Sequence, residues 1–327
     1  MHAIIPVAGV GSRLRPHTYT LPKVLLNVAG KPILGHILDR LRDDGVTSAT
    51  IVVGYMGNLV EKYVRTHHHD LEVNFVTQDE LLGLGHSIWV ARESFPPKGE
   101  PLLIILGDTI YDVDLKSVLS SPVSSLGVKI VDDPRRFGVA ELSGGYISRL
   151  VEKPDNPTTN LAVVGLYFIK HPEMLLGCLN EIVAGDKRHK GEYQLTDALQ
   201  MMIDQGEKFT TFNVDAWYDC GKPETMLSTN RHLLQKNSKP RDLPGVVTIP
   251  PVYIGANAEI LNSIIGPFAT IGEGARVTDS IIRNSIIGDE SSVSGVLLDN
   301  SIVGNNGAVK GGFKRVNAGD SSEVDFQ

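Results

Sequence analysis

The sequence predicts a three-layer α/β domain with a mostly parallel, Rossmann-like sheet, followed by a short left-handed parallel β-helix. Up to about residue 235, short aliphatic runs alternate with stretches of helical periodicity, which is the pattern of an α/β domain. Beyond the polar linker, aliphatic residues recur every five or six positions, a period of neither helix nor strand. We therefore expect an α/β domain over 1–235, a linker over 236–245, a β-helix over 246–312 and a flexible tail over 313–327.

The strands and helices of the first domain are expected in strict alternation. The expected strands are AIIPVA, ATIVVGY, EVNFVTQ and PLLIILGD, and the expected helices between them are PILGHILDRLRD, GNLVEKYVRTH and HSIWVARESF. Nearly continuous apolar strands such as LLIIL suit a parallel sheet that is covered on both faces. Ligands of such sheets bind at the carboxyl ends of the strands. The strand-like segments between about 126 and 169 have a more antiparallel character and predict a second lobe that closes over the first.

The repeat after the linker predicts the β-helix. Small residues follow the aliphatic position in IGANAE, IGEGAR, IGDESS and VGNNGA, and three such hexads make one triangular coil. A loop-rich end of a β-sandwich is the alternative. The recurring aliphatic positions are Ile260, Ile265, Ile271, Val277, Ile282, Ile287, Val293, Leu298, Val303 and Val309.

Composition excludes several classes of function. The 31 basic and 38 acidic side chains give a net charge of −7 without a basic block, so nucleic acids and anionic membranes are not expected partners. Cys178 and Cys220 are too few for a disulfide scaffold, which favours a reducing, cytoplasmic location. No export signal or membrane span is expected. The histidines at 67–69 lack partners at zinc spacing and are expected at a solvated helix end.

The turn in VAGVGSRLRPHTYTLPK follows the first expected strand and predicts a phosphate site. Backbone amides at Gly9 and Gly11 are not shielded by side chains and can converge on an anion. Three cations share the same proline-stiffened loop and can surround a triphosphate, namely Arg13, Arg15 and Lys23. A plain tight turn and a solvated basic loop are the alternatives.

Polar residues follow other expected strands. Asp108 ends LLIILGD and Asp219 stands in WYDCG, so the two could supply oxygen ligands to Mg²⁺, which binds through one or two carboxylates plus substrate phosphates. Asp112 is a further candidate, although a capping role fits it equally well. Gln78 follows a strand, and its carboxamide complements the imide edge of uracil or thymine. At another strand end, Glu152 could bond sugar hydroxyls. Turn, surface and exposed ion-pair roles remain the alternatives for these residues.

The segment PVAGVGSRLRP…PK resembles the signature of the sugar-1-phosphate nucleotidyltransferases, the family of glucose-1-phosphate uridylyl- and thymidylyltransferases. The likeness continues in order through Q…GLGHS, LGD, FGVAE, EKP, NLAVVGLY, GEYQLTD and WYDCGKPE, and the family often carries a left-handed β-helix. It implies Mg²⁺ on Asp108 and Asp219, and catalytic roles for Arg13, Lys23 and Asp108. It implies nucleotide contacts from Ala8, Gly9, Gly11, Ser12, Arg13, Gln78 and Gly83. It implies sugar-phosphate contacts from Gly138, Glu152, Lys153, Val163, Tyr167 and Trp217.

The resemblance implies transfer of a nucleotidyl group from a pyrimidine nucleoside triphosphate to a hexose 1-phosphate, by default glucose 1-phosphate, with release of pyrophosphate. AGVGSR is one residue shorter than the thymidylyltransferase loop, like the uridylyltransferase loop, but it has Ser12 where that loop has threonine, so the choice of nucleotide stays open. GLGHS also resembles the uridylyltransferases, and we therefore favour UTP over dTTP. A GTP-dependent mannose-1-phosphate guanylyltransferase and a non-catalytic sugar-nucleotide sensor are the alternatives. Acyl transfer by the β-helix lacks a histidine base, since none follows His232. We expect a homo-oligomer, formed through the β-helix or the catalytic domain.

Overall fold

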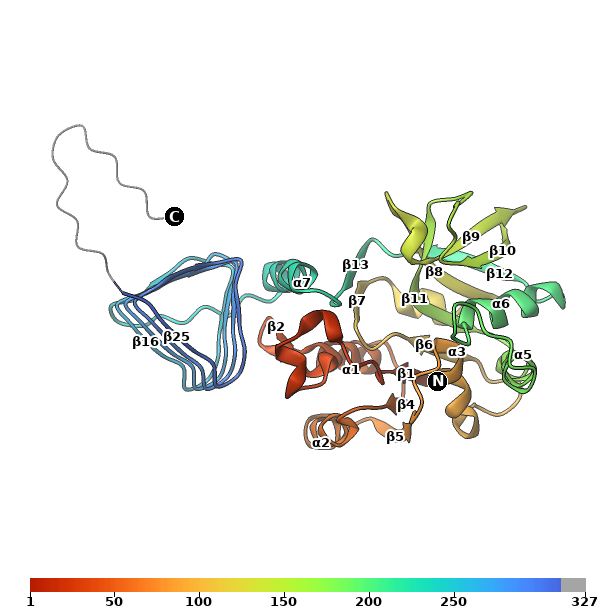
Figure 1. Cartoon of the computed structure of the whole chain (residues 1–327), viewed down its shortest axis with the longest axis horizontal. Helices are drawn as coiled ribbons and strands as arrows, with labels where there is room; N and C mark the ends of the chain where they lie inside the picture. The colour runs from red at the N-terminus through yellow and green to blue at the C-terminus, as the bar shows by residue number, and fades with distance from the viewer. Residues whose placement is uncertain (313–327) are drawn as a thin grey trace. The chain divides into compact units, whose positions relative to one another are not determined.

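The computed structural model describes residues 1–312, which fold into two compact units (Figure 1). The first unit contains Met1–Leu26 and Lys31–Thr229, and the second contains Asn27–Gly30 and the chain from Asn230 onward. The boundary falls within helix α7 (Pro223–Lys236). The tail expected at 313–327 lies outside the described residues.

The first unit is built on a nine-stranded sheet whose main path has the order β10-β9-β11-β6-β1-β4-β5. Four of these strands are parallel: β6 (Leu102–Ile105), β1 (His2–Pro6), β4 (Ser48–Val53) and β5 (Glu72–Thr77). Ile4 is fully buried and pairs with Thr50 on one side and Ile104 on the other. The buried aliphatic runs thus form the centre of a parallel sheet, which confirms the predicted α/β core.

The strands expected as a second lobe instead continue the same sheet. Strand β11 (Leu161–Ile169) pairs antiparallel with β6, placing Tyr167 opposite Ile104, and this pairing extends the sheet past its parallel part. The remaining strands lie beyond β11 and are β8 (Ser124–Ile130), β9 (Gly138–Ser143), β10 (Tyr146–Glu152) and β12 (Phe209–Asn213). A separate two-stranded antiparallel sheet comprises β7 (Thr109–Asp112) and β13 (Ala216–Asp219).

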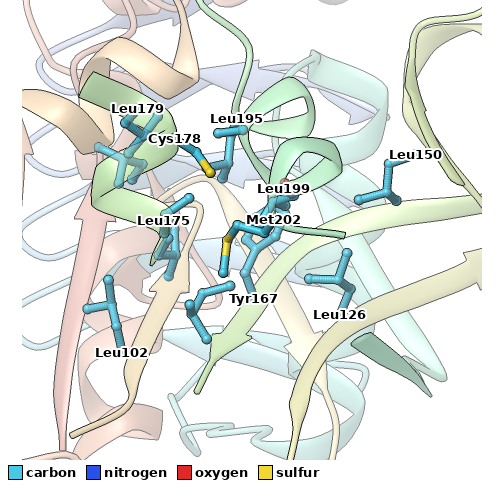
Figure 2. Packing of buried hydrophobic residues seen from close by; sticks show 14 of the residues in the cluster. Leu102, Leu126, Leu150, Tyr167, Leu175, Cys178, Leu179, Leu195, Leu199 and Met202 are labelled. Atoms are coloured by element: carbon cyan, nitrogen blue, oxygen red, sulfur yellow. The ribbon is translucent and has the colours of Figure 1, made fainter. Parts of the chain in front are cut away.

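Helices cover the sheet and close its core. They are α1 (Ile33–Asp43), α2 (Gly57–His67), α3 (Leu84–Val90), α4 (Leu115–Leu119), α5 (Pro172–Ala184) and α6 (Leu195–Asp204). Figure 2 shows Leu175 of α5 and Met202 of α6 directed toward Leu102, Leu126 and Tyr167 of the sheet. Nowhere in residues 1–312 does a helix reach the length and apolarity that a bilayer crossing requires.

The second unit contains the predicted left-handed β-helix, and its coils form a triangle in Figure 1. Three parallel sheets of four strands each make its walls, in the orders β14-β17-β20-β23, β15-β18-β21-β24 and β16-β19-β22-β25. The repeat positions pack into the core of the β-helix: eight of the ten recurring aliphatic residues are buried, and Leu298 and Val309 are partly buried. The strand bounds are β14 Val247–Thr248, β15 Val252–Ile254, β16 Glu259–Leu261, β17 Ile264–Ile265, β18 Ala269–Ile271, β19 Arg276–Thr278, β20 Ile281–Arg283, β21 Ile286–Ile287, β22 Ser292–Ser294, β23 Leu297–Asp299, β24 Ile302–Val303 and β25 Ala308–Lys310.

The short segment Asn27–Gly30 belongs to this second unit although it lies near the start of the chain. The buried side chain of Asn230 accepts hydrogen bonds from the Ala29 amide (2.8 Å) and from the Thr270 hydroxyl (2.7 Å). It also donates to the Phe268 carbonyl at 3.3 Å. One asparagine therefore connects this segment to residues 268–270 of the β-helix, at strand β18.

Candidate functional site

The glycine turn after β1 has a backbone that only glycine accommodates easily. Gly11 has φ of 67°, and a Cβ placed there would lie 2.9 Å from Cβ of Lys23. The Thr18 hydroxyl donates to the Gly11 carbonyl at 3.0 Å and fixes the turn. A short 3₁₀ turn, Ser12–Leu14, starts directly after Gly11. The tight turn brings the backbone of the loop against Lys23, so the loop and this cation form one surface.

A first pocket of about 470 Å³ opens at the carboxyl ends of the parallel strands. Its lining includes all the residues expected to contact the nucleotide, together with Lys23 and Asp108: Ala8, Gly9, Gly11, Ser12, Arg13, Gln78 and Gly83. Arg15 is not among the residues that line it. The strand-end location predicted from the sequence is therefore where these side chains meet.

Two carboxylates and one lysine converge at the edge of this pocket. The Nζ atom of Lys23, which is 8% exposed, forms an ion pair with Asp108 and lies 3.9 Å from Oδ1 of Asp219. Asp219 reaches Asp108 because β13 pairs with β7, and the Cys220 amide donates to the Asp108 carbonyl at 3.0 Å. Two carboxylates facing one cation form the oxygen donor set that Mg²⁺ takes when phosphates complete its coordination. The residues present therefore fit this ion.

A second pocket of about 220 Å³ lies beside the first. Arg13 and Asp108 line both pockets, so a phosphate group on either side can reach the same two side chains. Asp219 lines it. So do five of the residues expected to contact the sugar phosphate: Gly138, Glu152, Val163, Tyr167 and Trp217. Lys153 is not among them. Its Nζ lies 3.2 Å from Oε1 of Glu152, and its backbone has φ of 42°.

Several residues in the two pockets were not singled out from the sequence. Thr196 lines the second pocket and donates to Oε2 of Glu152 at 2.7 Å, which orients that carboxylate. Arg136 also lines it and adds a cation. Ser87 and Glu192 line the first pocket, and the Ser87 hydroxyl is buried without a hydrogen-bond partner among residues 1–312. Glu192 and Thr196 lie in GEYQLTD, which carried the resemblance but was assigned no role.

Burial shifts the acid–base behaviour of groups around the site. It raises the pKa of the Cys220 thiol to about 12, so this cysteine beside Asp219 stays protonated. Burial likewise raises the pKa of Tyr167, the aromatic wall of the second pocket. The Trp217 indole packs edge-on against Phe137 with ring centroids 5.0 Å apart, and its Nε1 is buried with no hydrogen-bond partner in the described part of the chain. Phe137, Tyr167 and Trp217 give the second pocket neutral walls around its charged groups.

Comparison with known proteins matches this arrangement. The family model for the nucleotidyl transferases covers residues 2–236. A glucose-1-phosphate thymidylyltransferase of Streptomyces griseus is 32% identical over 317 residues, which cover 88% of this chain and 87% of that protein. A UTP–glucose-1-phosphate uridylyltransferase of Haloferax volcanii is 29% identical over 248 residues, which cover 73% of this chain and 99% of that one. The crystal structure of a UDP-glucose pyrophosphorylase complexed with UDP-glucose has a TM-score of 0.63 at 26% identity, over 72% of this chain and 99% of that one.

Proposed function

Because this chain belongs to the nucleotidyl transferase family, as a sugar-1-phosphate nucleotidyltransferase, we propose that it joins UTP to glucose 1-phosphate. The products would be UDP-glucose and pyrophosphate. One observation carries the proposal: two pockets share Arg13 and Asp108, with Lys23 and Asp219 at the same place. The first pocket suits a nucleoside triphosphate and the second suits a sugar phosphate, so the reacting groups meet at their common wall.

The chain supplies positive charge where the triphosphate reacts. An oxygen of the sugar phosphate forms a bond to the α-phosphorus, and the bond from that phosphorus to the pyrophosphate oxygen breaks. Arg13 can form two parallel hydrogen bonds to phosphate oxygens, and Lys23 follows the charge as it moves onto the leaving pyrophosphate. Mg²⁺ held by Asp108 and Asp219 would add positive charge against the phosphate oxygens.

The sugar phosphate is bound from the other side. Glu152, oriented by Thr196, accepts hydrogen bonds from sugar hydroxyls. Arg136, which lines the second pocket, supplies the charge that the phosphate monoester needs, while Lys153 pairs with Glu152 outside that lining. No general base is required, because a phosphate monoester is already an anion at neutral pH. The site therefore accelerates the transfer by positioning the two substrates and stabilising their charge.

The choice of UTP is supported by the short AGVGSR loop and by the relatives. The Haloferax volcanii relative is described as acting on UTP. The Streptomyces griseus relative is described as a thymidylyltransferase, which makes dTTP the second candidate. Its match covers 88% of this chain and therefore extends beyond the family domain at residues 2–236.

A substrate panel tests the proposal. UTP, dTTP, CTP, GTP and ATP are each combined with several hexose 1-phosphates, and pyrophosphate release is measured with Mg²⁺. We expect the fastest release with UTP and glucose 1-phosphate. Faster release with dTTP would select the second candidate, and GTP with mannose 1-phosphate would identify a guanylyltransferase. Binding without turnover for every pair would point to a sensor.

We also propose that the β-helix mediates self-association. The β15-β18-β21-β24 wall is covered within the second unit, since Thr270 on it is 1% exposed. The β16-β19-β22-β25 wall is polar and carries Glu259, Arg276 and Lys310. The β14-β17-β20-β23 wall differs, because aliphatic side chains stack outward along it in register: Val247, Ile264, Ile281 and Leu297. Leu297 is 61% exposed.

Such a stripe is complementary to itself, because pairing two copies buries aliphatic against aliphatic side chains. The neighbouring charges Arg283 and Asp299 already pair at 3.0 Å, so contact leaves no charge unmatched. Sedimentation of Leu297→Glu should show a smaller assembly than the unmodified chain. Leu261→Glu, at a leucine 59% exposed on the polar wall, should not change the assembly. Equal behaviour of both variants would refute the assignment to this wall.

A further inference from the structure

The amide of Gln78 has a fixed orientation in the first pocket. Gln78 follows β5 and is 4% exposed. Its Nε2 lies 3.3 Å from the Gly83 carbonyl oxygen and 3.1 Å from Nδ1 of His86. A carbonyl oxygen only accepts, so the Gln78 atom that faces Gly83 must be the nitrogen. Both amide hydrogens are then used within the chain.

In this orientation the Gln78 side chain can only accept a hydrogen bond from a ligand in the pocket. Its Oε1 receives no hydrogen bond from any group in residues 1–312. A carboxamide can in principle donate or accept toward a ligand, but this one can only accept. The distinction matters, because bases that differ in the protonation of one ring nitrogen require opposite partners.

His86 holds this orientation together with the Gly83 carbonyl, because each accepts one hydrogen of the Gln78 amide. Because Nδ1 accepts from Gln78, it carries no proton and the imidazole is neutral, with its hydrogen on Nε2. The ring stacks on Trp89 with ring centroids 5.8 Å apart and approaches Tyr193 at 6.0 Å. The ring is therefore held in place and Nδ1 stays aimed at Gln78.

We propose that His86 is a positioning residue for base selection, which turns the Gln78 amide so that its Oε1 faces the nucleotide. The inference rests on the proposed function and deepens it. Uracil, thymine and guanine present a ring N–H that can donate to this oxygen. Cytosine and adenine present an unprotonated ring nitrogen there, and two acceptors would face each other. The unpartnered hydroxyl of Ser87 in the same pocket can donate to the adjoining base carbonyl.

Binding of UMP and CMP without metal tests the inference apart from catalysis. The full chain is compared with His86→Ala, with His86→Asn, whose side-chain oxygen can still accept from Gln78, and with His69→Ala, an exposed control. We expect His86→Ala to lower the UMP-over-CMP preference about tenfold, the scale of one misdirected hydrogen bond. His86→Asn should restore most of it, and His69→Ala should keep it.

The outcomes separate this inference from the proposed function. If the unmodified chain prefers UMP and releases pyrophosphate from UTP, but His86→Ala keeps the same base preference, only the role of His86 is refuted. A His86→Asn variant as impaired as His86→Ala would also refute it, because the acceptor would not then be the property that matters. If the unmodified chain binds neither nucleotide, the proposed function fails and this inference fails with it.

The pH dependence of the UMP-over-CMP preference is a second measurement, and a purely structural role of His86 would not affect it. Burial lowers the pKa of His86 below its usual 6.5, while Glu80 raises it and Arg188 lowers it. The neutral ring therefore persists above that pKa, and base preference should fall as the pH drops through it. Protonated Nδ1 would become a donor and lose its bond from Gln78. His86→Asn should abolish this acid-side loss, and a profile unchanged by that substitution would contradict the inference.

Discussion

Gly11→Ala is expected to destabilise the first unit far more than Gly9→Ala, although the two glycines are two residues apart in one loop. Gly11 has φ of 67°, and an added Cβ would meet Cβ of Lys23 at 2.9 Å and Cγ2 of Thr18 at 3.2 Å. The contact with Lys23 is close to the backbone, so a simple side-chain rotation does not relieve it. An added Cβ at Gly9 meets nothing within 4 Å.

The magnitude follows from these contacts. A left-handed backbone costs an alanine about 1–2 kcal/mol, and the overpacking against Lys23 costs at least about 1 kcal/mol more. The reduced freedom of the unfolded chain returns less than about 1 kcal/mol. We expect Gly11→Ala to lower the free energy of unfolding by about 2–3 kcal/mol. Gly9→Ala should stay within about 1 kcal/mol of the unmodified chain.

Urea unfolding followed by tryptophan fluorescence measures this difference. Both tryptophans, Trp89 and Trp217, lie in the first unit, so their signal reports that unit. The two alanine variants are compared at the same protein concentration. Equal midpoints for the two variants would refute the reasoning, because it would mean that the Gly11 backbone can relax away from Lys23 without cost.

Three further changes test the site and the β-helix. Lys23→Met should lower kcat/KM by about 10²–10³-fold, the effect of removing one cation from the developing charge, and a loss under threefold would place Lys23 outside the reaction. Asp219→Asn should raise the Mg²⁺ concentration for half-maximal activity about tenfold in a metal titration, and an unchanged titration would remove it as a ligand. Asn230→Ala leaves the Ala29 amide and the Thr270 hydroxyl without their acceptor, so it should lower the stability of the second unit by about 2–4 kcal/mol in circular-dichroism melts. Thr270→Val removes one of these bonds and should cost less, and equal losses would contradict this account.

Local patterns were enough to predict the framework of this chain. The aliphatic strands followed by Gly9, Gln78 and Asp108 predicted a shared ligand edge, because parallel strands end on one side of a sheet. The five-to-six-residue repeat predicted the β-helix, because the aliphatic side chains that fill its coils must recur at a fixed interval. Both inferences depend on residues near one another in the chain.

Features that depend on distant contacts could not be predicted in the same way. No local pattern shows that β11 pairs with β6, so the later strands were expected as a separate lobe. The histidines were weighed only as zinc ligands, and the contact between His86 and Gln78 depends on how the chain folds back over Gly83. The place of Lys153 outside the second pocket depends on its positive φ and its pairing with Glu152.

The short segment Asn27–Gly30 limits how the β-helix can be exchanged between proteins. The chain passes between the two units after Leu26, after Gly30 and after Thr229, so a single cut does not separate them. Val28 is fully buried, and a Cβ at Gly30 would overlap the Tyr253 ring. A graft of this β-helix onto another catalytic unit would therefore have to transplant the tetrapeptide as well.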